Sequence, residues 1–265
     1  MNHNENHFWI ESGFTLVELL VAVAVAGILG TGIMSLYINN SKTYETQNLV
    51  TEAQQNVRAG MNALTRDIQM AGFDPDKIAS AGFLQAGTGS LQVTMDLDRN
   101  GTIASGDENV TYAINGSGHL GRNTNTVAEN VTALGFAYSI DSDNDGQLDV
   151  DDNGTPGDLT DDRLIWAVIG ANGNWWDLDT DGDGTIALAD DSDGDDLING
   201  VDTGIAADLD DIRAVKIWLL VETSRQDRTG GPTLDFVVGD RVVHSNDGLR
   251  RRLLVTSVNC RNMGI

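Results

Sequence analysis

The feature that most constrains this chain is an unbroken apolar stretch close to its N-terminus. From Phe14 to Ile38 the sequence reads FTLVELLVAVAVAGILGTGIMSLYI, 25 residues with one charge at Glu18. About 20 apolar residues suffice for a helix to cross a bilayer. A cleaved secretory signal has a shorter apolar core, of about 7–15 residues, followed by a small-x-small cleavage site. The stretch therefore predicts a long apolar helix and not an ordinary secretory signal.

The carboxylate of Glu18, five residues into this stretch, needs a partner. A charged side chain at the centre of a membrane helix costs about 2.5–3.5 kcal/mol on insertion scales, which disfavours an ordinary anchor helix. Opposite charges attract more strongly in lipid than in water, so a cation that arrives on assembly would offset this cost. We therefore expect Glu18 to be functional.

The heptapeptide from Gly13 to Leu19, GFTLVEL, closely resembles the type III signal of prepilins and pseudopilins. In that family a membrane prepilin peptidase cuts after the glycine and methylates the new N-terminal residue. The resemblance implies a leader of residues 1–13, cleavage between Gly13 and Phe14, and N-methylation of Phe14. It also implies an assembly contact between Glu18 and the α-amino group of Phe14 on a neighbouring subunit. The leader has no Lys or Arg, which usually hold such leaders in the cytoplasm, and this leaves the efficiency of processing open.

Helical periodicity continues beyond the apolar stretch. Apolar residues recur every three or four positions at Val50, Ala53, Val57, Met61, Leu64, Ile68 and Ala71. The pattern predicts one helix from Phe14 to Ala71, with residues 14–38 as membrane anchor and filament core and residues 39–71 as an amphipathic half. Gly72 is a plausible C-cap. Gly27, Gly30 and Gly32 indicate either close helix packing or local unwinding within a filament.

Residues 72–265 are predicted to form a β-rich head domain. Short runs with many β-branched residues alternate with turns, which favours an antiparallel sheet and an α+β fold. The predicted strands are Leu91–Met95, Asn109–Ile114, Val131–Ile140, Leu164–Ile169, Ile212–Glu222, Asp235–Val238 and Arg251–Val258.

Three strings in the sequence sharpen the resemblance. They are MNALTRDIQMAGFDP (Met61–Pro75), DIRAVKIWLLVETS (Asp211–Ser224) and LRRRLLVTSVNCRN (Leu249–Asn262). Together they resemble PilW-type minor pilins, with the J-type pseudopilin of type II secretion as a near relative. This implies a pilin fold, an inner-membrane single-pass protein with its head outside the cytoplasm, and later a place in a pilus or pseudopilus. The implied partners are other pilins or pseudopilins, an inner-membrane assembly platform and membrane lipid.

The negative charge of the chain is concentrated in one region. The formal net charge is -24, and 22 of the 40 acidic residues lie between Asp141 and Asp211, where Arg163 is the sole Lys or Arg. Such a charge repels nucleic acid, which is excluded as a partner. A disordered acidic tail is disfavoured because apolar residues such as Trp166 and Trp175 interrupt the run.

Asp-rich loops with the spacing of calcium ligands are the most specific feature of the head. Calcium loops of the EF-hand kind place oxygens at positions 1, 3, 5, 7, 9 and 12 and glycine at position 6. Four stretches approach this pattern. Their candidate ligands are Asp96, Asp98, Asn100, Thr102 and Asp107 in loop A; Asp141, Asp143, Asp145, Gln147, Asp149 and Asp152 in loop B; Asp179, Asp181, Asp183, Thr185 and Asp190 in loop C; and Asp191, Asp193, Asp195 and Asp202 in loop D. The pattern predicts structural Ca²⁺ sites, and a solvated acidic loop is the alternative.

Catalysis has no support in the sequence, so we expect no enzymatic activity. It contains neither a phosphate-binding glycine loop nor a nucleophile with a neighbouring base. His119 and His244 are isolated, and Cys260 is expected to be a small buried residue. Trp175 and Trp176 are expected to be buried against loop C, with a binding platform as the alternative.

The sequence leaves three functions open. The first is a minor pilin that helps assemble, prime or cap a type IV pilus, and the second is a pseudopilin of type II secretion. The third, from another class, is a calcium-dependent adhesin displayed on a pilus.

Overall fold

The computed structural model describes residues 13–152, 158, 160, 162–227 and 232–264. The predicted leader lies outside the described residues except for Gly13. The chain divides into two compact units, residues 1–47 and 48–265, which are described separately below.

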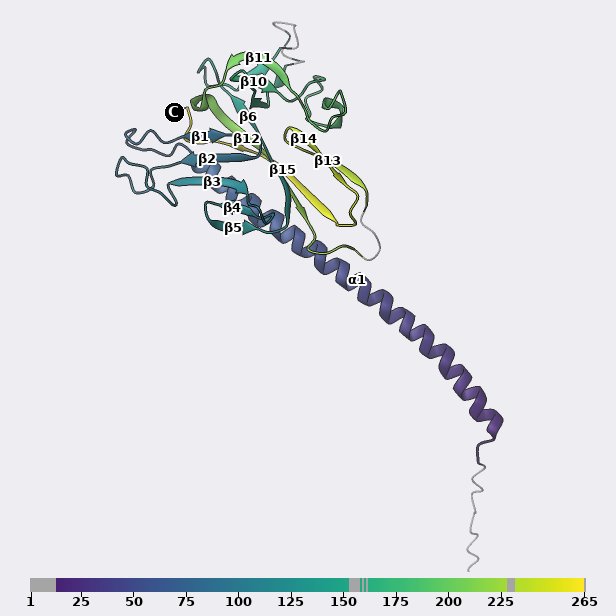
Figure 1. Cartoon of the computed structure of the whole chain (residues 1–265). Coiled ribbons are helices and arrows are strands. Elements are labelled where there is room, and N and C mark those ends of the chain that lie inside the picture. The colour runs from purple at the N-terminus through teal and green to yellow at the C-terminus, as the bar shows by residue number, and fades with distance from the viewer. Residues whose placement is uncertain (1–12, 153–157, 159, 161, 228–231, 265) are drawn as a thin grey trace, which may run out of the picture. The chain divides into compact units, whose positions relative to one another are not determined.

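The described part of the first unit is the beginning of helix α1 (Leu16–Met70) (Figure 1). The helix starts two residues later and ends one residue earlier than predicted. Large apolar side chains are exposed all along the anchor half, from Phe14 (88% exposed) to Ile38 (41%). Among the described residues α1 is long and apolar enough to cross a membrane, by length and composition.

The part of α1 within the second unit buries one face. Its buried positions are Leu49, Ala53, Val57, Gly60, Met61, Leu64, Asp67 and Ile68, at the spacing that the sequence predicts. Gly72 follows the helix with φ +76°, a left-handed conformation that glycine adopts without strain, and it therefore ends α1 as expected.

All strand pairings are antiparallel, so the fold is α+β as predicted. One sheet has the order β1-β2-β3-β4-β5, and a second has the order β11-β10-β9-β6-β12-β15. The first sheet consists of β1 (Phe83–Ala86), β2 (Ser90–Thr94), β3 (Asn109–Ile114), β4 (Leu120–Arg122) and β5 (Asn125–Ala128). The second consists of β6 (Val131–Ile140), β9 (Ala167–Ile169), β10 (Asn174–Asp177), β11 (Val201–Ala206), β12 (Ile212–Glu222) and β15 (Arg251–Asn259). The remaining strands form two ribbons. One ribbon pairs β7 (Val150–Asp151) with β8 (Arg163–Leu164), and the other pairs β13 (Leu234–Val238) with β14 (Arg241–Ser245). There are also two short 3-10 turns, η1 (Leu188–Asp190) and η2 (Leu209–Asp211).

The six-stranded sheet is covered on both faces. On one face α1 packs against both sheets, and a Cβ on Gly60 would lie 2.8 Å from Leu219 Cδ2 and 3.1 Å from Leu120 Cδ2. On the other face Trp218 and Leu220 pack against the β13–β14 ribbon. A Cβ on Gly135 would lie 2.6 Å from the backbone nitrogen of Gly239, so glycine is required where this ribbon crosses β6.

The four outer edges of the two sheets differ in regularity. The pairings of β1, β5 and β11 with their neighbours each contain a register shift, whereas β15 pairs with β12 without a shift over all nine of its residues. Arg250 C=O accepts from Thr223 N–H (2.9 Å) and Cys260 N–H donates to Arg213 C=O (2.8 Å). Alternate residues between them, from Arg251 to Asn259, therefore direct their backbone groups away from β12. No strand among the described residues pairs with this outer side, so β15 is a long and regular edge.

Most of the predicted strands are present, and one prediction was wrong. The predicted strand Leu164–Ile169 is split, because Leu164 pairs with Val150 in β7 whereas Ala167 pairs with Asp177 in β10. Between the two pieces, Trp166 N–H donates to Asp177 Oδ1 (3.3 Å). The chain thus changes from one sheet to another at this point, which a run of apolar residues does not reveal.

Candidate functional site

Two groups of residues carry the chemistry suggested by the sequence, and the first is the start of α1. Thr15 N–H and Thr15 Oγ1–H both donate to Glu18 Oε2 at 3.0 Å, and Glu18 N–H donates to Thr15 Oγ1 at 3.3 Å. This reciprocal arrangement is a capping box, which satisfies backbone donors at a helix N-terminus. Within the single chain, the Glu18 carboxylate is therefore hydrogen-bonded to Thr15.

This role of Glu18 was not predicted, although its signal is present in the sequence. Thr15-Leu16-Val17-Glu18 has the T-x-x-E spacing of a capping box immediately before an apolar run. Gly13 and Phe14 precede the helix and are exposed, so the predicted cleavage bond lies outside regular structure.

The second group is the four acidic loops, which share one backbone path. The first aspartate of each loop accepts hydrogen bonds from the N–H groups four and five residues later. In loop C, Asp179 Oδ1 accepts from Asp183 N–H (3.2 Å) and Asp179 Oδ2 accepts from Gly184 N–H (2.8 Å). Asp96, Asp141 and Asp191 make the equivalent pairs of bonds. The loops therefore wrap around the first carboxylate.

In three of the loops a carboxylate from the end of the loop accepts a hydrogen bond from a backbone N–H near its beginning, and we call it the closing carboxylate. Glu108 accepts from Leu97 N–H (2.8 Å) in loop A, Asp149 from Ser142 N–H (3.2 Å) in loop B, and Asp190 from Thr180 N–H (2.6 Å) in loop C. One oxygen from each member of Asp96/Asp98/Glu108, of Asp141/Asp143/Asp149 and of Asp179/Asp181/Asp190 lies within 4.8 Å of the others. Asp191, Asp193 and Asp195 converge in the same way in loop D.

Three residues predicted at the twelfth ligand position are not among these convergent groups. Asp107 Oδ1 instead pairs with Arg122 Nη1 (2.7 Å), and Asp202 accepts from the side-chain amides of Asn172 (2.7 Å) and Asn174 (3.0 Å). Asp152 follows β7, and Asp149 closes loop B in its place. Glu108 was not predicted as a ligand because it lies at position 13 of loop A, one residue beyond the expected spacing. A second acidic residue directly after Asp107 was the signal in the sequence that could have identified it.

The fifth residue of each loop stabilises a turn of the loop. It accepts a hydrogen bond from the N–H two residues ahead, at 2.8–3.0 Å, and these fifth residues are Asn100, Asp145, Asp183 and Asp195. The donors in loops A, B and C belong to Thr102, Gln147 and Thr185. These contacts are Asx-turns, which form with or without a metal.

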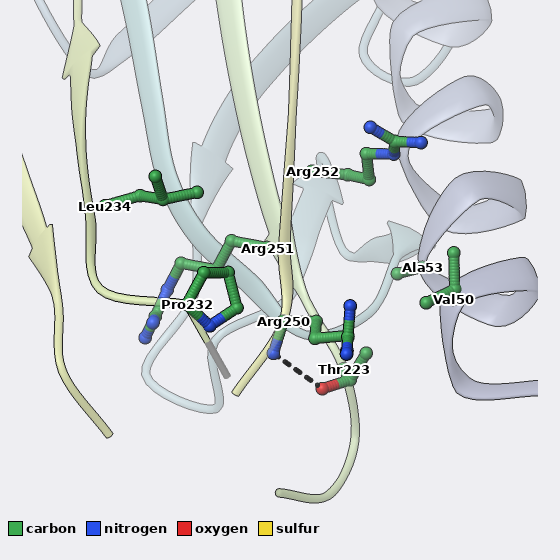
Figure 2. Close-up of a pocket in the computed structure, with 8 residues that line it drawn as sticks. All are labelled: Val50, Ala53, Thr223, Pro232, Leu234, Arg250, Arg251 and Arg252. Carbon is green, nitrogen blue, oxygen red and sulfur yellow. Dashed lines mark hydrogen bonds between the residues drawn. The ribbon is translucent and has the colours of Figure 1, made fainter. Parts of the chain in front are cut away.

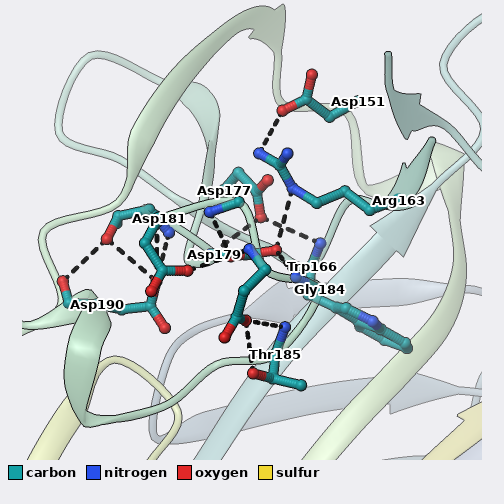
Figure 3. A network of polar contacts seen from close by, with 12 residues as sticks. Asp151, Arg163, Trp166, Asp177, Asp179, Asp181, Gly184, Thr185 and Asp190 are labelled. Carbon is teal, nitrogen blue, oxygen red and sulfur yellow. Dashed lines mark hydrogen bonds and ion pairs between the residues drawn. The ribbon is translucent and has the colours of Figure 1, made fainter. Parts of the chain in front are cut away.

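Arg163 links loop C to the β7–β8 ribbon (Figure 3). Its Nε lies 3.0 Å from Asp179 Oδ2, and its Nη2 bonds Asp151. Neighbouring Asp177 is 4% exposed, and its burial raises the pKa of its carboxyl to about 6. A single cation therefore serves two carboxylates in the most acidic part of the chain.

His244, in β14, connects loop D to the β13–β14 ribbon. Its Nδ1 lies 2.6 Å from Asp235 Oδ1 and its Nε2 lies 2.8 Å from Asp196 Oδ1. The bond to Asp235, followed by that to Asp196, raises the pKa of the imidazole to about 9. Far from being isolated, His244 bridges two segments that lie 39 residues apart in the sequence.

Two hollows adjoin these elements. The smaller, about 240 Å³, lies between α1 and the start of β15 and is lined partly by three consecutive arginines (Figure 2). Arg250 Nε lies 2.5 Å from Asp227, and Arg251 Nη2 lies 2.8 Å from Glu222, so the charges of these two arginines are already paired. The larger, about 620 Å³, lies between the β7–β8 ribbon and β11.

Trp175 and Cys260 are buried, as predicted. Trp175 packs on Tyr138, with ring centroids 6.0 Å apart, so its partner is the core and not loop C. Trp176 is partly exposed and donates its Nε1–H to Asn172 Oδ1 (3.0 Å). Burial raises the pKa of the Cys260 thiol to about 12, which makes this cysteine unreactive.

Comparison with known proteins yields one motif and one structural likeness. Residues 11–34 match the family described as the prokaryotic N-terminal methylation motif. Among solved structures, the type IV-like pilin TTHA1219 from Thermus thermophilus is similar at a TM-score of 0.38 and 13% identity, covering 80% of this chain and 98% of that one. No curated protein matches the chain.

Proposed function

We propose that this chain is a type IV pilin-like subunit, processed between Gly13 and Phe14 and assembled through the helix that begins there. The observation that carries the proposal is the N-terminal methylation motif at residues 11–34, which coincides with the exposed apolar start of α1. A helix with apolar side chains on all sides is stable in lipid or among other such helices. The subunit is anchored in the inner membrane first and packed in a filament later.

Within this class we propose a minor pilin of the PilW type. This finer proposal rests on the three sequence strings in α1, β12 and β15, which occupy the end of the helix and two neighbouring strands of the six-stranded sheet. They pack together in the main core, where Ile68, Ile217 and Val258 are buried. The prepilin peptidase, other pilins and the assembly platform are the partners of such a subunit.

Glu18 is proposed to exchange one partner for another during assembly. In the single chain its carboxylate accepts from Thr15. After cleavage the α-amino group of Phe14 on a neighbouring subunit provides a full positive charge, which binds a carboxylate in lipid far more strongly than a neutral donor does. The capping box therefore keeps Glu18 hydrogen-bonded until that charge arrives.

We also propose that the acidic loops hold structural Ca²⁺. Support comes from the convergence of three carboxylate oxygens within 4.8 Å in each loop. Ca²⁺ takes six to eight oxygen ligands, and extracellular calcium modules bind at about 0.1–1 mM. Loops A, B and C, each with a closing carboxylate, are the stronger candidates.

The filament proposal is tested by complementation of a strain that lacks the gene. Glu18→Ala is expected to abolish incorporation into pili, because it removes the charge that pairs with Phe14. Thr15→Ala is the matched control: it breaks the same capping box at about 1 kcal/mol but leaves the charge in place, so pili are expected to form. Immunoblots of sheared filaments measure incorporation, and secretion and adhesion are scored separately. Normal incorporation of Glu18→Ala would contradict the proposed contact.

A further inference from the structure

The outer edge of β15 presents a row of backbone groups without partners. Arg250 and Cys260 bond to the neighbouring chain segment through their backbone, so alternate residues between them point outward. The outward residues are Arg251, Leu253, Val255, Ser257 and Asn259. In the described part of the chain no group is hydrogen-bonded to their backbone N–H and C=O. An edge of this length and regularity is a structure to which an extended chain adds as a further strand.

The smaller hollow flanks the start of this edge and gives it two walls (Figure 2). Val50 and Ala53 of α1 line it on one face of the six-stranded sheet, and Pro232 and Leu234 line it on the other. Leu234 is 47% exposed, and Val255, further along the strand, is 41% exposed. An added strand with apolar side chains would remove this apolar surface from water.

Two arginines at the start of the edge select what it binds. The Arg251 side chain is 6% exposed and pairs with Glu222 and Asp247, but its buried Nε has no hydrogen-bond partner among the described residues. Arg252 is exposed, points toward α1 in Figure 2 and forms no ion pair within the described residues. A buried donor without an acceptor is costly, and an unpaired guanidinium favours a carboxylate. This end of the edge therefore favours a segment that carries side-chain oxygens and a negative charge.

A second copy of this strand fits the edge less well. Residues 249–262 contain four arginines and neither Asp nor Glu. Two such strands in an antiparallel pair would use the same backbone groups, but they would bring the arginines of one copy to those of the other. Charge complementarity therefore favours a different chain with a carboxylate in its extended segment.

We propose that the outer edge of β15 binds an extended acidic segment of a partner polypeptide as an additional strand. The partner's backbone bonds to the outward groups of β15, and a side-chain carboxylate pairs with Arg252. Antiparallel pairing, the slightly more stable arrangement, places this carboxylate near the C-terminal end of the bound segment. The contact lies in the head and goes beyond the filament proposal, which concerns the start of α1.

The test is fluorescence anisotropy of a labelled peptide titrated with the full-length chain in detergent micelles. The probe is a blocked nine-residue peptide, one residue for each position of β15, in which valine and threonine alternate and glutamate is the penultimate residue. In one control peptide glutamine replaces the glutamate, and in the other the valine nitrogens, which would face β15, are methylated. We expect saturable binding of the glutamate peptide, binding weaker by about three- to tenfold for the glutamine peptide, and none for the methylated peptide.

Hydrogen exchange locates the bound peptide. The glutamate peptide is expected to slow exchange of the outward amides of Leu253, Val255 and Ser257. The amides of Leu254 and Thr256 already face β12, so their exchange should not change.

Two pairs of variants test the backbone and the charge separately. Val255→Pro removes one outward N–H at an edge position that tolerates proline, and it should abolish binding; Val255→Thr keeps the N–H and should bind within about twofold of wild type. Arg252→Gln is expected to weaken binding of the glutamate peptide about three- to tenfold and to leave the glutamine peptide unaffected. Arg261→Gln, the same charge change beyond the far end of β15, is its control.

Four results would overturn the proposal. They are the absence of saturable binding, equal affinity for the glutamate and glutamine peptides, undiminished binding of the methylated peptide, and protection of the outward amides by self-association before any peptide is added. The last would identify a second copy as the occupant. None of them bears on the role of Glu18, so this edge and the filament proposal stand or fall separately.

Discussion

At the scale of single residues, the acidic loops depend on left-handed backbone at two positions each. The fourth and sixth residues of every loop have positive φ: Arg99 and Gly101, Asn144 and Gly146, Gly182 and Gly184, Gly194 and Asp196. Glycine and asparagine adopt this conformation readily, whereas other side chains are strained in it. Loop D places aspartate at the sixth position and has no closing carboxylate among the described residues, and both features make it the weakest of the four proposed calcium sites.

The closing carboxylate of loop A gives the first prediction. Glu108→Gln is expected to lower the calcium affinity of loop A by about tenfold or more, because calcium prefers a charged, bidentate oxygen ligand there. Asp107→Asn, one residue away, is the matched control and is expected to leave the affinity within about twofold, since Asp107 pairs with Arg122. Isothermal titration with calcium distinguishes them. Equal losses in the two variants would mean that the sequence spacing, and not the observed geometry, identifies the ligand.

His244 gives a prediction about pH. The folded-state pKa of its imidazole is raised to about 9 from an ordinary 6.5 by Asp235 and Asp196. Protonation therefore stabilises the fold, an effect that is complete below pH 6.5 and is lost as pH rises from 6.5 through 9. Amide exchange around loop D and the β13–β14 ribbon is expected to accelerate over this window in the wild type. In His244→Gln the exchange rates, corrected for intrinsic pH dependence, should stay flat; a parallel rise in both proteins would contradict the assignment.

Sequence reasoning located the loops and most of their convergent carboxylates, but it missed Glu108. The first, third and fifth positions follow from strict alternation, because Asx-turns fix their local geometry within six residues. The closing residue lies after a stretch of variable length, at Glu108, Asp149 or Asp190, and its position depends on where the following strand or turn begins. The same limit applies to Asp177, whose partners come from loop C and from the segment that joins β8 to β9.

At the scale of elements, a buried ionic contact fixes α1 to the five-stranded sheet. Asp67, 4% exposed on the buried face of α1, accepts from Tyr112 Oη–H (2.8 Å) and pairs with Arg122 Nε (2.5 Å). The helical pattern counted Ile68 and Leu64 toward the buried face and left Asp67 unassigned. A charged residue that belongs to the buried stripe becomes recognisable only when its partners on β3 and β4 are known.

Removing this carboxylate should be costly. Asp67→Ala is expected to lower the free energy of unfolding by about 3–5 kcal/mol, because it removes the buried partner of the largely buried Arg122 guanidinium and leaves it the exposed Asp107. Arg66→Ala is the control: Arg66 touches the same carboxylate, but its side chain is 69% exposed, and a loss below about 1 kcal/mol is expected. Chemical denaturation of both variants measures the difference. A loss below about 1 kcal/mol in Asp67→Ala would show that the contact is not essential to the packing of α1.

Sequence reasoning was most accurate for the longest elements. The long helix and the long strands β6 and β12 were predicted to within two residues, since each buries many residues in a regular pattern. The shorter strands β1, β4, β5, β10, β11 and β14 were not predicted. Each contains three to six residues and exists because a neighbour satisfies its backbone, which no local pattern encodes.

At the scale of the whole molecule, folding is expected to depend on calcium through the region from Asp141 to Asp211. Without a cation the convergent carboxylates repel one another. At calcium concentrations about a hundredfold above Kd, each occupied site stabilises the folded chain by about 2.7 kcal/mol. Melts of the full-length chain in detergent should therefore shift upward with calcium relative to EGTA, and much less with magnesium at equal concentration. Superimposed curves in calcium and EGTA would refute structural calcium.

The regular edge formed by β15 has a consequence for how the protein behaves when it is produced in quantity. Most proteins shorten, bulge or cover such edges, as this chain does at β1, β5 and β11, because an open row of backbone donors and acceptors recruits any extended chain. Away from its natural neighbours the head therefore has a preferred direction of self-association, in addition to the apolar start of α1. Loss of soluble material during purification should begin along this strand, while the remainder of the molecule keeps its native structure.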